Sequence, residues 1–256
     1  MKAQPNFIKG VPLILKADLH IHSICRKRLS YCPFLYDSVQ TVNAILQRAL
    51  DSEIRILAIT DHDTLAGYRK AKRIVESYGL DLLLIPGCEI SSAEGHILAY
   101  QIETEIPKGL SAKETVARIH DQGGYAVAAH PYFVGSLKDR VFDLDLDAFE
   151  GFNSTVCIVS NIKSIDAARR MGLPYLANSD AHQVEEIGRS YTLFPDETHN
   201  AADLFRQLRA GEYVTCFTRS DSLQMIKRHL YRNLQIQFQP NLRPGRSEVE
   251  SFATLN

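Results

Sequence analysis

The sequence predicts an α/β fold, and a single β/α barrel with a short C-terminal extension accounts best for its pattern. Short apolar runs rich in β-branched residues alternate with segments of helical period over about 200 residues. Several of these runs, such as Ala126–Ala129, are apolar throughout, as expected of parallel strands that helices cover on both faces. The length of 256 residues suits one large domain of this class.

The strands are expected where the apolar runs are short and end at glycine, proline or polar residues. For most of the chain, each run is followed by a helical segment, which is typical of repeated strand–helix units. We place the strands at Leu13–Leu19, Ile54–Thr60, Leu82–Pro86, His96–Tyr100, Tyr125–Ala129, Ala148–Phe152, Tyr175–Asn178, Tyr191–Phe194 and Tyr213–Phe217.

The helices are expected between the strands, where apolar residues recur at spacings of three and four. Asp37 is the predicted cap of the first helix, and Ser111 with Glu114 forms a capping box at the third. A glycine that follows the last turn, such as Gly79, marks where a helix ends. The predicted helical ranges are 39–49, 64–79, 111–123, 160–172 and 200–211.

Residues 1–219 are predicted to form the barrel domain, and residues 220–256 a C-terminal extension. Within the extension, Ser222–Arg232 has the pattern of a short basic helix and Leu234–Phe238 that of an edge strand. The residues that follow, Asn241–Asn256, have the composition of a loose tail. We expect the extension to form a strap over the core or a contact with a second copy of the chain, giving a homo-oligomer.

Composition and charge exclude several classes of protein. The chain is 45% hydrophobic and 23% charged with a net charge of -1, which excludes a disordered chain and a strongly basic nucleic-acid coat. No apolar run approaches the roughly 20 residues of a membrane helix. No signal peptide is apparent, so we expect a cytoplasmic protein without a membrane partner. The five cysteines are scattered without a Cys-x-x-Cys motif, and we expect free thiols.

Residue types that bind metals gather at the ends of the predicted strands. His20 and His22, two residues apart on one strand, point to the same face and can reach one cation. The C-terminal ends of barrel strands meet at one rim, which is where catalytic residues lie. Imidazoles with carboxylates bind Zn²⁺, Mn²⁺ or Fe²⁺ in hydrolytic sites, so we expect a metal cluster. The candidate ligands are His20, His22, His62, Glu89, His96, His130, Asp180 and His182.

Six motifs carry these residues: Asp18-Leu-His-Ile-His-Ser, Ile59-Thr-Asp-His-Asp-Thr, Pro86-Gly-Cys-Glu-Ile-Ser, Gly95-His-Ile-Leu-Ala, Ala128-Ala-His-Pro and Asn178-Ser-Asp-Ala-His. In this order, from about Ala17 to Phe217, the chain resembles the polymerase and histidinol phosphatase (PHP) superfamily. Glu150-Gly-Phe-Asn and Ile187-Gly-Arg-Ser-Tyr-Thr resemble its stand-alone phosphoesterase branch. The resemblance implies a distorted seven-stranded, TIM-like β/α barrel that holds two or three divalent metal ions and hydrolyses phosphomonoesters or phosphodiesters.

The resemblance also implies a role for each candidate ligand. Glu89 would bridge two metals, one completed by His20, His22 and Asp180 and the other by His96 and His130. A third metal would take His62 and His182. In the family this third site has an aspartate shortly after the His-x-His pair, whereas this chain has no carboxylate between Ser23 and Tyr36. Three alternatives stay open: another residue or water replaces the aspartate, the third metal binds weakly, or the site works with two metals.

Arginines near the predicted rim are candidates for binding a substrate phosphate, because the guanidinium group pairs well with phosphate oxygens. Arg26 and Arg28 follow the first strand, and the alternative for them is a solvated basic loop. Arg189 lies further along the chain on the same rim, where an ion pair with Glu185 or Glu186 is the competing role.

Other ionisable residues near the motifs are assigned supporting roles. Asp18, Asp61 and Asp63 are expected to orient imidazole rings rather than to bind metal, because metal-binding histidines need such partners. His120, His199 and His229 are expected on the surface, in a turn and in the basic tail.

These residues predict a metal-dependent phosphoesterase that acts through metal-activated water. Asp180 belongs to the catalytic set, and His182 or His62, where not fully bound to metal, would protonate the leaving group. The substrate stays open among phosphorylated small molecules, nucleotides and short oligonucleotides, since the net charge of -1 disfavours long nucleic acid. Two alternatives are a catalytically silent metal-binding module for a phosphorylated ligand or partner, and a metal-dependent hydrolase of a non-phosphate bond.

Overall fold

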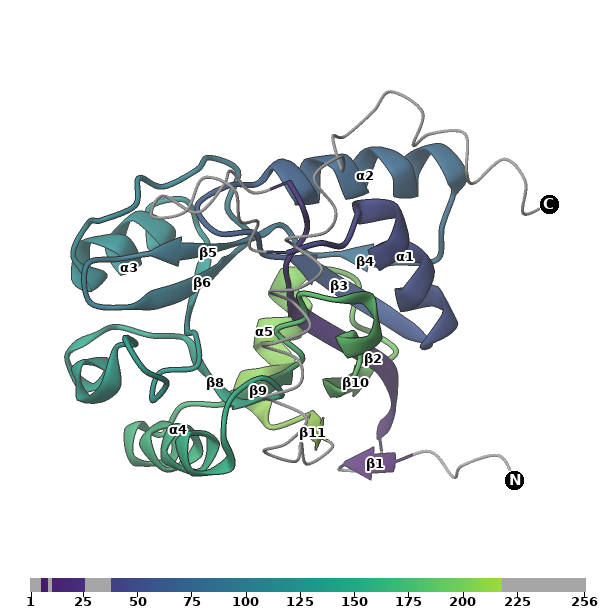
Figure 1. Ribbon diagram of the computed structural model, residues 1–256. Coiled ribbons are helices and arrows are strands. Elements are labelled where there is room, and N and C mark those ends of the chain that lie inside the picture. The colour runs from purple at the N-terminus through teal and green to yellow at the C-terminus, as the bar shows by residue number, and fades with distance from the viewer. Residues whose placement is uncertain (1–5, 9–10, 26–37, 218–256) are drawn as a thin grey trace.

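The computed structural model describes residues 6–8, 11–25 and 38–217. Two sheets form the framework of the molecule (Figure 1), one of six strands in the order β11-β10-β2-β3-β4 with β1 paired to β2, and one of five strands in the order β5-β6-β7-β8-β9. The strands of the larger sheet are β1 (Asn6–Ile8), β2 (Val11–Ile21), β3 (Ile54–Ile59), β4 (Leu83–Leu84), β10 (Ser190–Pro195) and β11 (Val214–Phe217). Those of the smaller sheet are β5 (Gly87–Ser91), β6 (His96–Tyr100), β7 (Tyr125–Ala128), β8 (Ala148–Asn153) and β9 (Tyr175–Asn178).

The predicted closed seven-stranded barrel is wrong. Both sheets mix parallel and antiparallel pairs, and in the described part of the chain the strand ladders are joined across the sheets by the isolated bridges Ile21–Ala181 and His62–Glu89. Two features account for the open arrangement. The larger sheet ends at β4, which has two residues, and β5 and β6 form an antiparallel hairpin where a barrel needs a strand–helix–strand unit.

Most of the predicted elements are present, with small shifts at their ends. The nine predicted strands and five predicted helices all have counterparts, whereas β1 and β5 were not predicted. The sequence analysis places no strand at Gly87–Ser91, directly after the predicted strand Leu82–Pro86, and these residues form β5. The helices are α1 (Val42–Asp51), α2 (Ala66–Tyr78), α3 (Ala112–His120), α4 (Ile158–Met171) and α5 (Ala201–Ala210), with 3₁₀ turns η1 (Lys138–Asp143) and η2 (Val184–Glu186).

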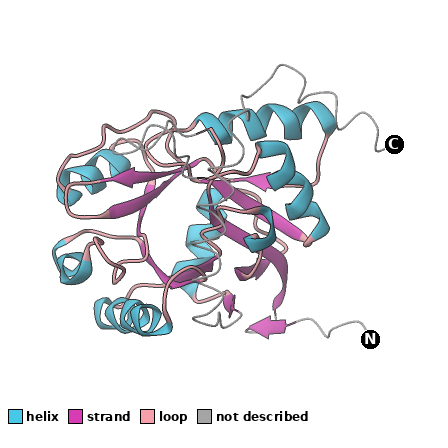
Figure 2. Cartoon of the chain, viewed as in Figure 1, coloured by secondary structure: helices cyan, strands magenta, loops and turns pink. Residues whose placement is uncertain are grey.

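Side-chain caps begin three of the helices. The Oγ1 atom of Thr41 accepts a hydrogen bond from the N–H of Ala44 at α1. Ser111 does the same for Glu114 at α3, as the capping-box pattern predicts, and Asn200 caps α5. Helices α1 and α2 pack beside β3, α3 beside β6 and β7, and α4 beside β8 (Figure 2).

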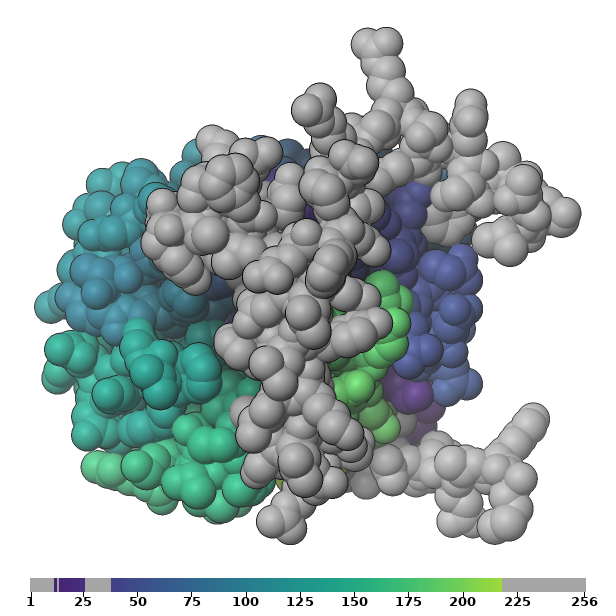
Figure 3. Space-filling view, viewed as in Figure 1, coloured from purple at the N-terminus to yellow at the C-terminus, as the bar shows by residue number. Residues whose placement is uncertain are grey.

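A central apolar cluster holds the two sheets together. It includes Leu19 of β2, Leu98 of β6, Leu176 of β9 and Phe194 of β10, which are buried. Phe205 of α5 belongs to the same cluster, so α5 fills the space between the sheets (Figure 1). Green segments from late in the chain lie against the purple N-terminal strand in the space-filling view (Figure 3), as the antiparallel pairing of β10 with β2 requires.

Hydrogen bonds bring the ends of β2, β3 and β9 to one place. The N–H of Thr60, directly after β3, donates to the carbonyl of Ile21 at 2.8 Å. The N–H of His22 donates to the carbonyl of Ala181, three residues after β9, at 2.9 Å. Residues that follow these strands in the sequence are therefore neighbours in space, and the polar motifs predicted at the strand ends meet there.

Some predictions fall on parts of the chain that the structure does not describe. These are the phosphate-binding roles of Arg26 and Arg28 and the extension 220–256. The predicted cap at Asp37 is wrong, because α1 begins at Val42 and Thr41 caps it. The described residues contain no helix that is long and apolar enough to cross a membrane. Among the described residues, Cys25, Cys88, Cys157 and Cys216 form no disulfide.

Candidate metal centre

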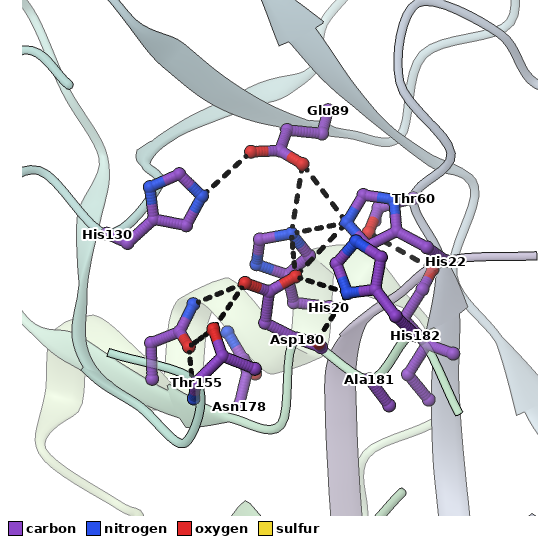
Figure 4. Close-up of polar contacts among 12 residues, drawn as sticks. His20, His22, Thr60, Glu89, His130, Thr155, Asn178, Asp180, Ala181 and His182 are labelled. Carbon is purple, nitrogen blue, oxygen red and sulfur yellow. Dashed lines mark hydrogen bonds and ion pairs between the residues drawn. The ribbon is translucent and has the colours of Figure 1, made fainter. Parts of the chain in front are cut away.

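Eight side chains predicted to bind metal gather in one cluster, and Figure 4 labels six of them: His20, His22, Glu89, His130, Asp180 and His182. Most of them lie at or just after the C-terminal ends of strands, as predicted, but His96 opens β6 instead. Because β6 runs antiparallel to β7, its first residues lie beside the last residues of β7, and His96 reaches the same edge of the sheet. The cluster consists of His20, His22, His62, Glu89, His96, His130, Asp180 and His182.

The carboxylate of Glu89 lies at the middle of the cluster. Its Oε1 atom is 2.8 Å from Nδ1 of His96 and 3.0 Å from Nε2 of His130. Its Oε2 atom faces the Nε2 atoms of three more histidines, His22 at 3.1 Å, His20 at 3.2 Å and His62 at 3.4 Å. Glu89 therefore presents one oxygen to each of two groups of imidazoles, which is the arrangement of a bridging carboxylate.

Asp180 closes the cluster from the loop after β9. Its Oδ1 atom lies 3.2 Å from Nε2 of His22 and 3.4 Å from Nε2 of His20. Its Oδ2 atom accepts hydrogen bonds from Nδ2 of Asn153 at 3.1 Å and from Oγ1 of Thr155 at 2.9 Å. These two donors fix the carboxylate so that the buried Oδ1 points toward the imidazoles.

Two residues of the cluster have backbone conformations that side chains seldom adopt. His130 has φ of 27° and Asp180 has φ of 52°, both in the left-handed region. Such a conformation costs on the order of 1 kcal/mol or more in a residue other than glycine. At both positions this conformation directs the side chain into the cluster shortly after a strand ends. The backbone is therefore strained at the two residues that carry these groups.

The donor set of the cluster fits divalent cations. Nδ1 of His20 donates to the carboxylate of Glu150 at 2.8 Å, so the lone pair of the neutral ring lies on Nε2. That Nε2 atom is 3.0 Å from Nε2 of His22 and faces the oxygens of Glu89 and Asp180. Nitrogen and oxygen atoms of four side chains thus converge on one point, where a cation would satisfy them.

Four overlapping groups of three residues bring their ligand atoms within 4.8 Å of one another. His62 and His182, which the resemblance pairs in a third site, fall in different groups, although both rings lie against the ring of His22. The groups are His20, His22 and Glu89; His20, His130 and Asp180; His22, Asp180 and His182; and His62, Glu89 and His96.

The electrostatics of the cluster favour positive charge among the imidazoles. Burial lowers the pKa of His20, but the charges of Asp180, Glu150 and Glu89 outweigh burial and hold this pKa well above its usual value. Burial raises the pKa of Glu89, but neighbouring imidazoles, chiefly His62, outweigh it and hold the pKa well below its usual value. Glu89 is therefore ionised, which is the form of a carboxylate that binds a cation.

The aspartates expected to orient imidazoles bond to loop backbone. Asp18 accepts hydrogen bonds from the N–H groups of Ser179 and Gly188, and burial raises its pKa to about 6. Asp63 accepts from the N–H of Ser91 at 2.8 Å. These bonds hold the loops that carry the cluster, so the prediction that Asp18 and Asp63 contact imidazoles directly is not what the structure shows.

Arg189, Glu186 and His120 have the following partners in the structure. The Nε atom of Arg189 donates to the carbonyl of Glu185 at 3.1 Å, and its role in binding phosphate stays a prediction. The carboxylate of Glu186 accepts a hydrogen bond from the N–H of His182 at 3.0 Å. His120 lies 3.0 Å from Asp147 at the end of α3, consistent with a packing role.

Sequence reasoning gave no role to Glu150, which directly contacts the cluster. Glu150 is buried in β8 and accepts from Nδ1 of His20. A signal was present in the sequence, because a glutamate between the apolar residues of a buried strand needs hydrogen-bonding partners.

Comparisons with known proteins point to one family. Residues 160–213 match the family model described as PHP-associated. The uncharacterized protein MJ1587 of Methanocaldococcus jannaschii is 41% identical over 143 residues, which cover 55% of this chain and 82% of that protein. The 5'-3' exoribonuclease Rnm of Escherichia coli is 36% identical over 94 residues, which cover 35% of this chain and 29% of the enzyme.

Solved structures share the fold at low sequence identity. A two-domain protein from Bacteroides vulgatus, containing a predicted PHP-like metal-dependent phosphoesterase, superposes with a TM-score of 0.64 at 18% identity, over 89% of this chain and 74% of that one. Endonuclease Q, in complex with a 27-mer duplex that has an abasic lesion at the active site, superposes with a TM-score of 0.56 at 16% identity, over 83% of this chain and 66% of that one.

Fold and site together define an α/β protein with a cluster of imidazoles and carboxylates suited to several divalent cations. More specifically, the chain belongs to the PHP superfamily.

Proposed function

We propose that the chain is a metal-dependent phosphoesterase that hydrolyses a phosphomonoester or phosphodiester of a nucleotide, a short oligonucleotide or a small molecule. The carboxylate of Glu89 carries this proposal, because its two oxygens face two separate groups of imidazoles. Bridging carboxylates of this kind hold pairs of cations in enzymes that cleave phosphate esters. The exoribonuclease and endonuclease among the similar proteins support a substrate with a phosphate ester.

Six side chains of the cluster are assigned a part in binding two cations. When bound, divalent cations supply a water of lowered pKa and neutralise charge on the phosphoryl oxygens. Asn153 and Thr155 hold Asp180 in the orientation that directs Oδ1 to the first position. We assign this first position to His20, His22 and Asp180, and the second to His96 and His130, with Glu89 shared.

His182 and His62 are the proposed donors of a proton to the leaving group. Nδ1 of His182 lies 2.9 Å from the carbonyl oxygen of Asp180 and donates to it, which fixes the ring beside the cluster. The ring of His62 lies against His22 and His96 on another side. A third cation would draw on these two histidines, and the segment between Ser23 and Tyr36 offers it no carboxylate.

Removal and return of metal tests the proposal. Dialysis against a chelator is expected to abolish hydrolysis of nucleotides, 5'-phosphorylated oligonucleotides and bis(p-nitrophenyl) phosphate, and Mn²⁺, Zn²⁺ or Fe²⁺ is expected to restore it. Metal analysis is expected to find about two ions per chain. A fully loaded protein that turns over none of these esters would refute the proposal and favour a silent metal-binding module. Turnover of amides or lactones alone would favour a metal-dependent hydrolase of a non-phosphate bond.

Exposed apolar side chains lie in two segments near this centre, and they indicate which kind of substrate it prefers. Five of the eight large hydrophobic side chains that are exposed among the described residues lie in the loop after His130 or at the start of α4. Ser160 of α4 donates to the carbonyl of Tyr132, which joins the two segments. The five are Phe133, Val134, Ile158, Val159 and Ile162, called here the apolar rim.

The apolar rim fits a substrate that carries a nucleobase. The ring of Phe133 is 43% exposed and packs edge-on against the ring of His130, with 5.9 Å between the ring centroids. A phosphate held in the cluster would place the base of a nucleotide within reach of this ring, since base and phosphate are one sugar apart. A sugar phosphate gains nothing from an apolar surface, so we propose that nucleotides are the preferred substrates.

Phe133→Ala is expected to lower kcat/KM for a mononucleotide about tenfold, because stacking of a base on an aromatic ring is worth about 1–3 kcal/mol. Hydrolysis of ribose 5-phosphate, which has no base, is expected to change less than twofold, and Phe133→Trp is expected to retain nucleotide turnover. Tyr78→Ala removes an exposed aromatic ring elsewhere and is the matched control. An equal loss for both substrates would contradict the stacking role.

A further inference from the structure

Glu150 has more hydrogen-bonding partners than its place in β8 requires. Its side chain is 0% exposed, and its two carboxylate oxygens accept hydrogen bonds from four donors. Oε1 accepts from Nδ1 of His20 at 2.8 Å and from Nδ2 of Asn178 at 3.1 Å. Oε2 accepts from the N–H of His130 at 2.8 Å and from Nδ2 of Asn153 at 2.9 Å. Each oxygen thus has two donors, which fills the accepting capacity of a carboxylate.

These bonds determine which nitrogen of His20 carries the proton. Three of the four donors, the backbone N–H and the two side-chain amides, can only donate, so Glu150 acts purely as an acceptor. Nδ1 of His20 must then be the protonated nitrogen of the neutral ring. Nε2 is left with its lone pair, 3.2 Å from Oε2 of Glu89 and 3.4 Å from Oδ1 of Asp180, where a cation would bind.

The same carboxylate connects parts of the cluster that come from distant segments. His20 and Glu150 are 130 residues apart in the sequence. Through its N–H, His130 is held by Glu150 while its ring reaches Glu89 at 3.0 Å. Asn153 donates to Glu150 and also to Asp180, at 3.1 Å. Glu150 therefore touches, directly or through one amide, residues assigned to both cation positions.

We propose that Glu150 is a positioning residue that fixes the protonation of His20 and holds His130 and Asp180 in the arrangement that binds cations. The proposal rests on the metal centre of the proposed function and not on which bond is hydrolysed. Metal affinity therefore tests it separately from phosphoesterase activity.

Only a carboxylate satisfies the four donors. In Glu150→Gln, one oxygen is replaced by an NH₂ group, which would face two donors and can accept from neither. If the NH₂ group faces His20, that ring must accept at Nδ1 and carry its proton on Nε2, where a cation can no longer bind. If it faces His130, a buried N–H group loses its acceptor and the loop after β7 is displaced.

The test compares Mn²⁺ affinity of the metal-free full chain, by calorimetry or competition with a chelator, in the wild type and in three variants. Glu150→Gln is expected to bind Mn²⁺ about 10–100-fold more weakly, the range for loss of a residue that orients a metal ligand. Glu150→Asp, which keeps the charge, is expected to recover part of the loss. Asp147→Asn is the matched control, because its carboxylate also pairs with a histidine, His120 at 3.0 Å, outside the cluster.

A second measurement does not depend on whether the variants fold. In the Zn²⁺-loaded wild type, long-range ¹H–¹⁵N spectra are expected to show His20 with its proton on Nδ1 and its metal on Nε2. The opposite assignment, or unchanged Mn²⁺ affinity in Glu150→Gln, would overturn the proposal. A wild type that binds Mn²⁺ and hydrolyses no phosphate ester would refute the proposed function alone, whereas a wild type that binds no metal would overturn both.

Discussion

Glu89→Gln is expected to reduce turnover of phosphate esters roughly 10³-fold, because a bridging metal ligand contributes several kcal/mol to the transition state. The substitution keeps the size of the side chain and replaces one oxygen by an NH₂ group. Both oxygens of Glu89 lie within 3.4 Å of imidazole nitrogens, so either orientation of the amide puts a donor where a cation would bind. Steady-state assays at saturating Mn²⁺, with metal analysis of the same samples, measure the loss and its cause.

The matched control is Glu94→Gln, a glutamate five residues further along the chain. Its carboxylate accepts a hydrogen bond from the N–H of Ala112 at 2.6 Å, at the start of α3 and away from the cluster. Turnover in this variant is expected within twofold of the wild type. Retention of more than a tenth of the activity in Glu89→Gln, with the fold intact by circular dichroism, would rule out a bridging role for this carboxylate.

Gly95→Ala is expected to lower the free energy of unfolding by about 3 kcal/mol, which corresponds to a fall in Tm of about 10 °C. Gly95 has φ of 153°, a conformation that L side chains rarely adopt. An added Cβ would lie 2.5 Å from the backbone nitrogen of Leu137 and 2.9 Å from the carbonyl carbon of Ser136, and backbone atoms have little room to move. Thermal or urea unfolding measures the change.

The same substitution is expected to weaken metal binding, because the crowded segments carry residues of the cluster. Gly95 precedes His96, and Oγ of Ser136 lies 3.2 Å from Nδ1 of His130. Gly109→Ala is the control, since Gly109 also has a positive φ, 81°, but a Cβ there would meet nothing within 4 Å. We expect it to cost about 1 kcal/mol from backbone strain alone. Equal losses in the two variants would show that crowding at Gly95 is not the cause.

The candidate ligands could be predicted because their signal is local. Most are imidazoles or carboxylates placed where an apolar strand begins or ends, and His20 and His22 show the two-residue spacing of one strand face. The arrangement of these ligands within the cluster was harder to predict from the sequence. The pairing of His62 with His182 came from a resemblance, whereas the structure puts each of them in a different group around Glu89 or Asp180.

The supporting hydrogen bonds could not be predicted from spacing. Asp63, beside His62 in the sequence, was expected to orient an imidazole but holds the backbone of Ser91. The residue that does orient an imidazole is Glu150, whose partner His20 is 130 positions away. Proximity in the sequence is a poor guide to such pairs, because a side chain on a strand contacts neighbouring strands more than its own neighbours in the chain.

The helices, most strand positions, the cap at Ser111 and the residues of the candidate centre followed from the chain's own pattern of polarity. Each of these depends on interactions within a few residues. The pattern of polarity did not predict whether the sheet closes into a barrel. Whether β4 continues, and whether β5 turns back on β6, depends on hydrogen bonds between segments far apart, and these bonds leave no periodic trace in the sequence. The two open sheets, and the hydrogen bonds that Glu150 makes to both sides of the centre, are therefore decided only by the tertiary structure.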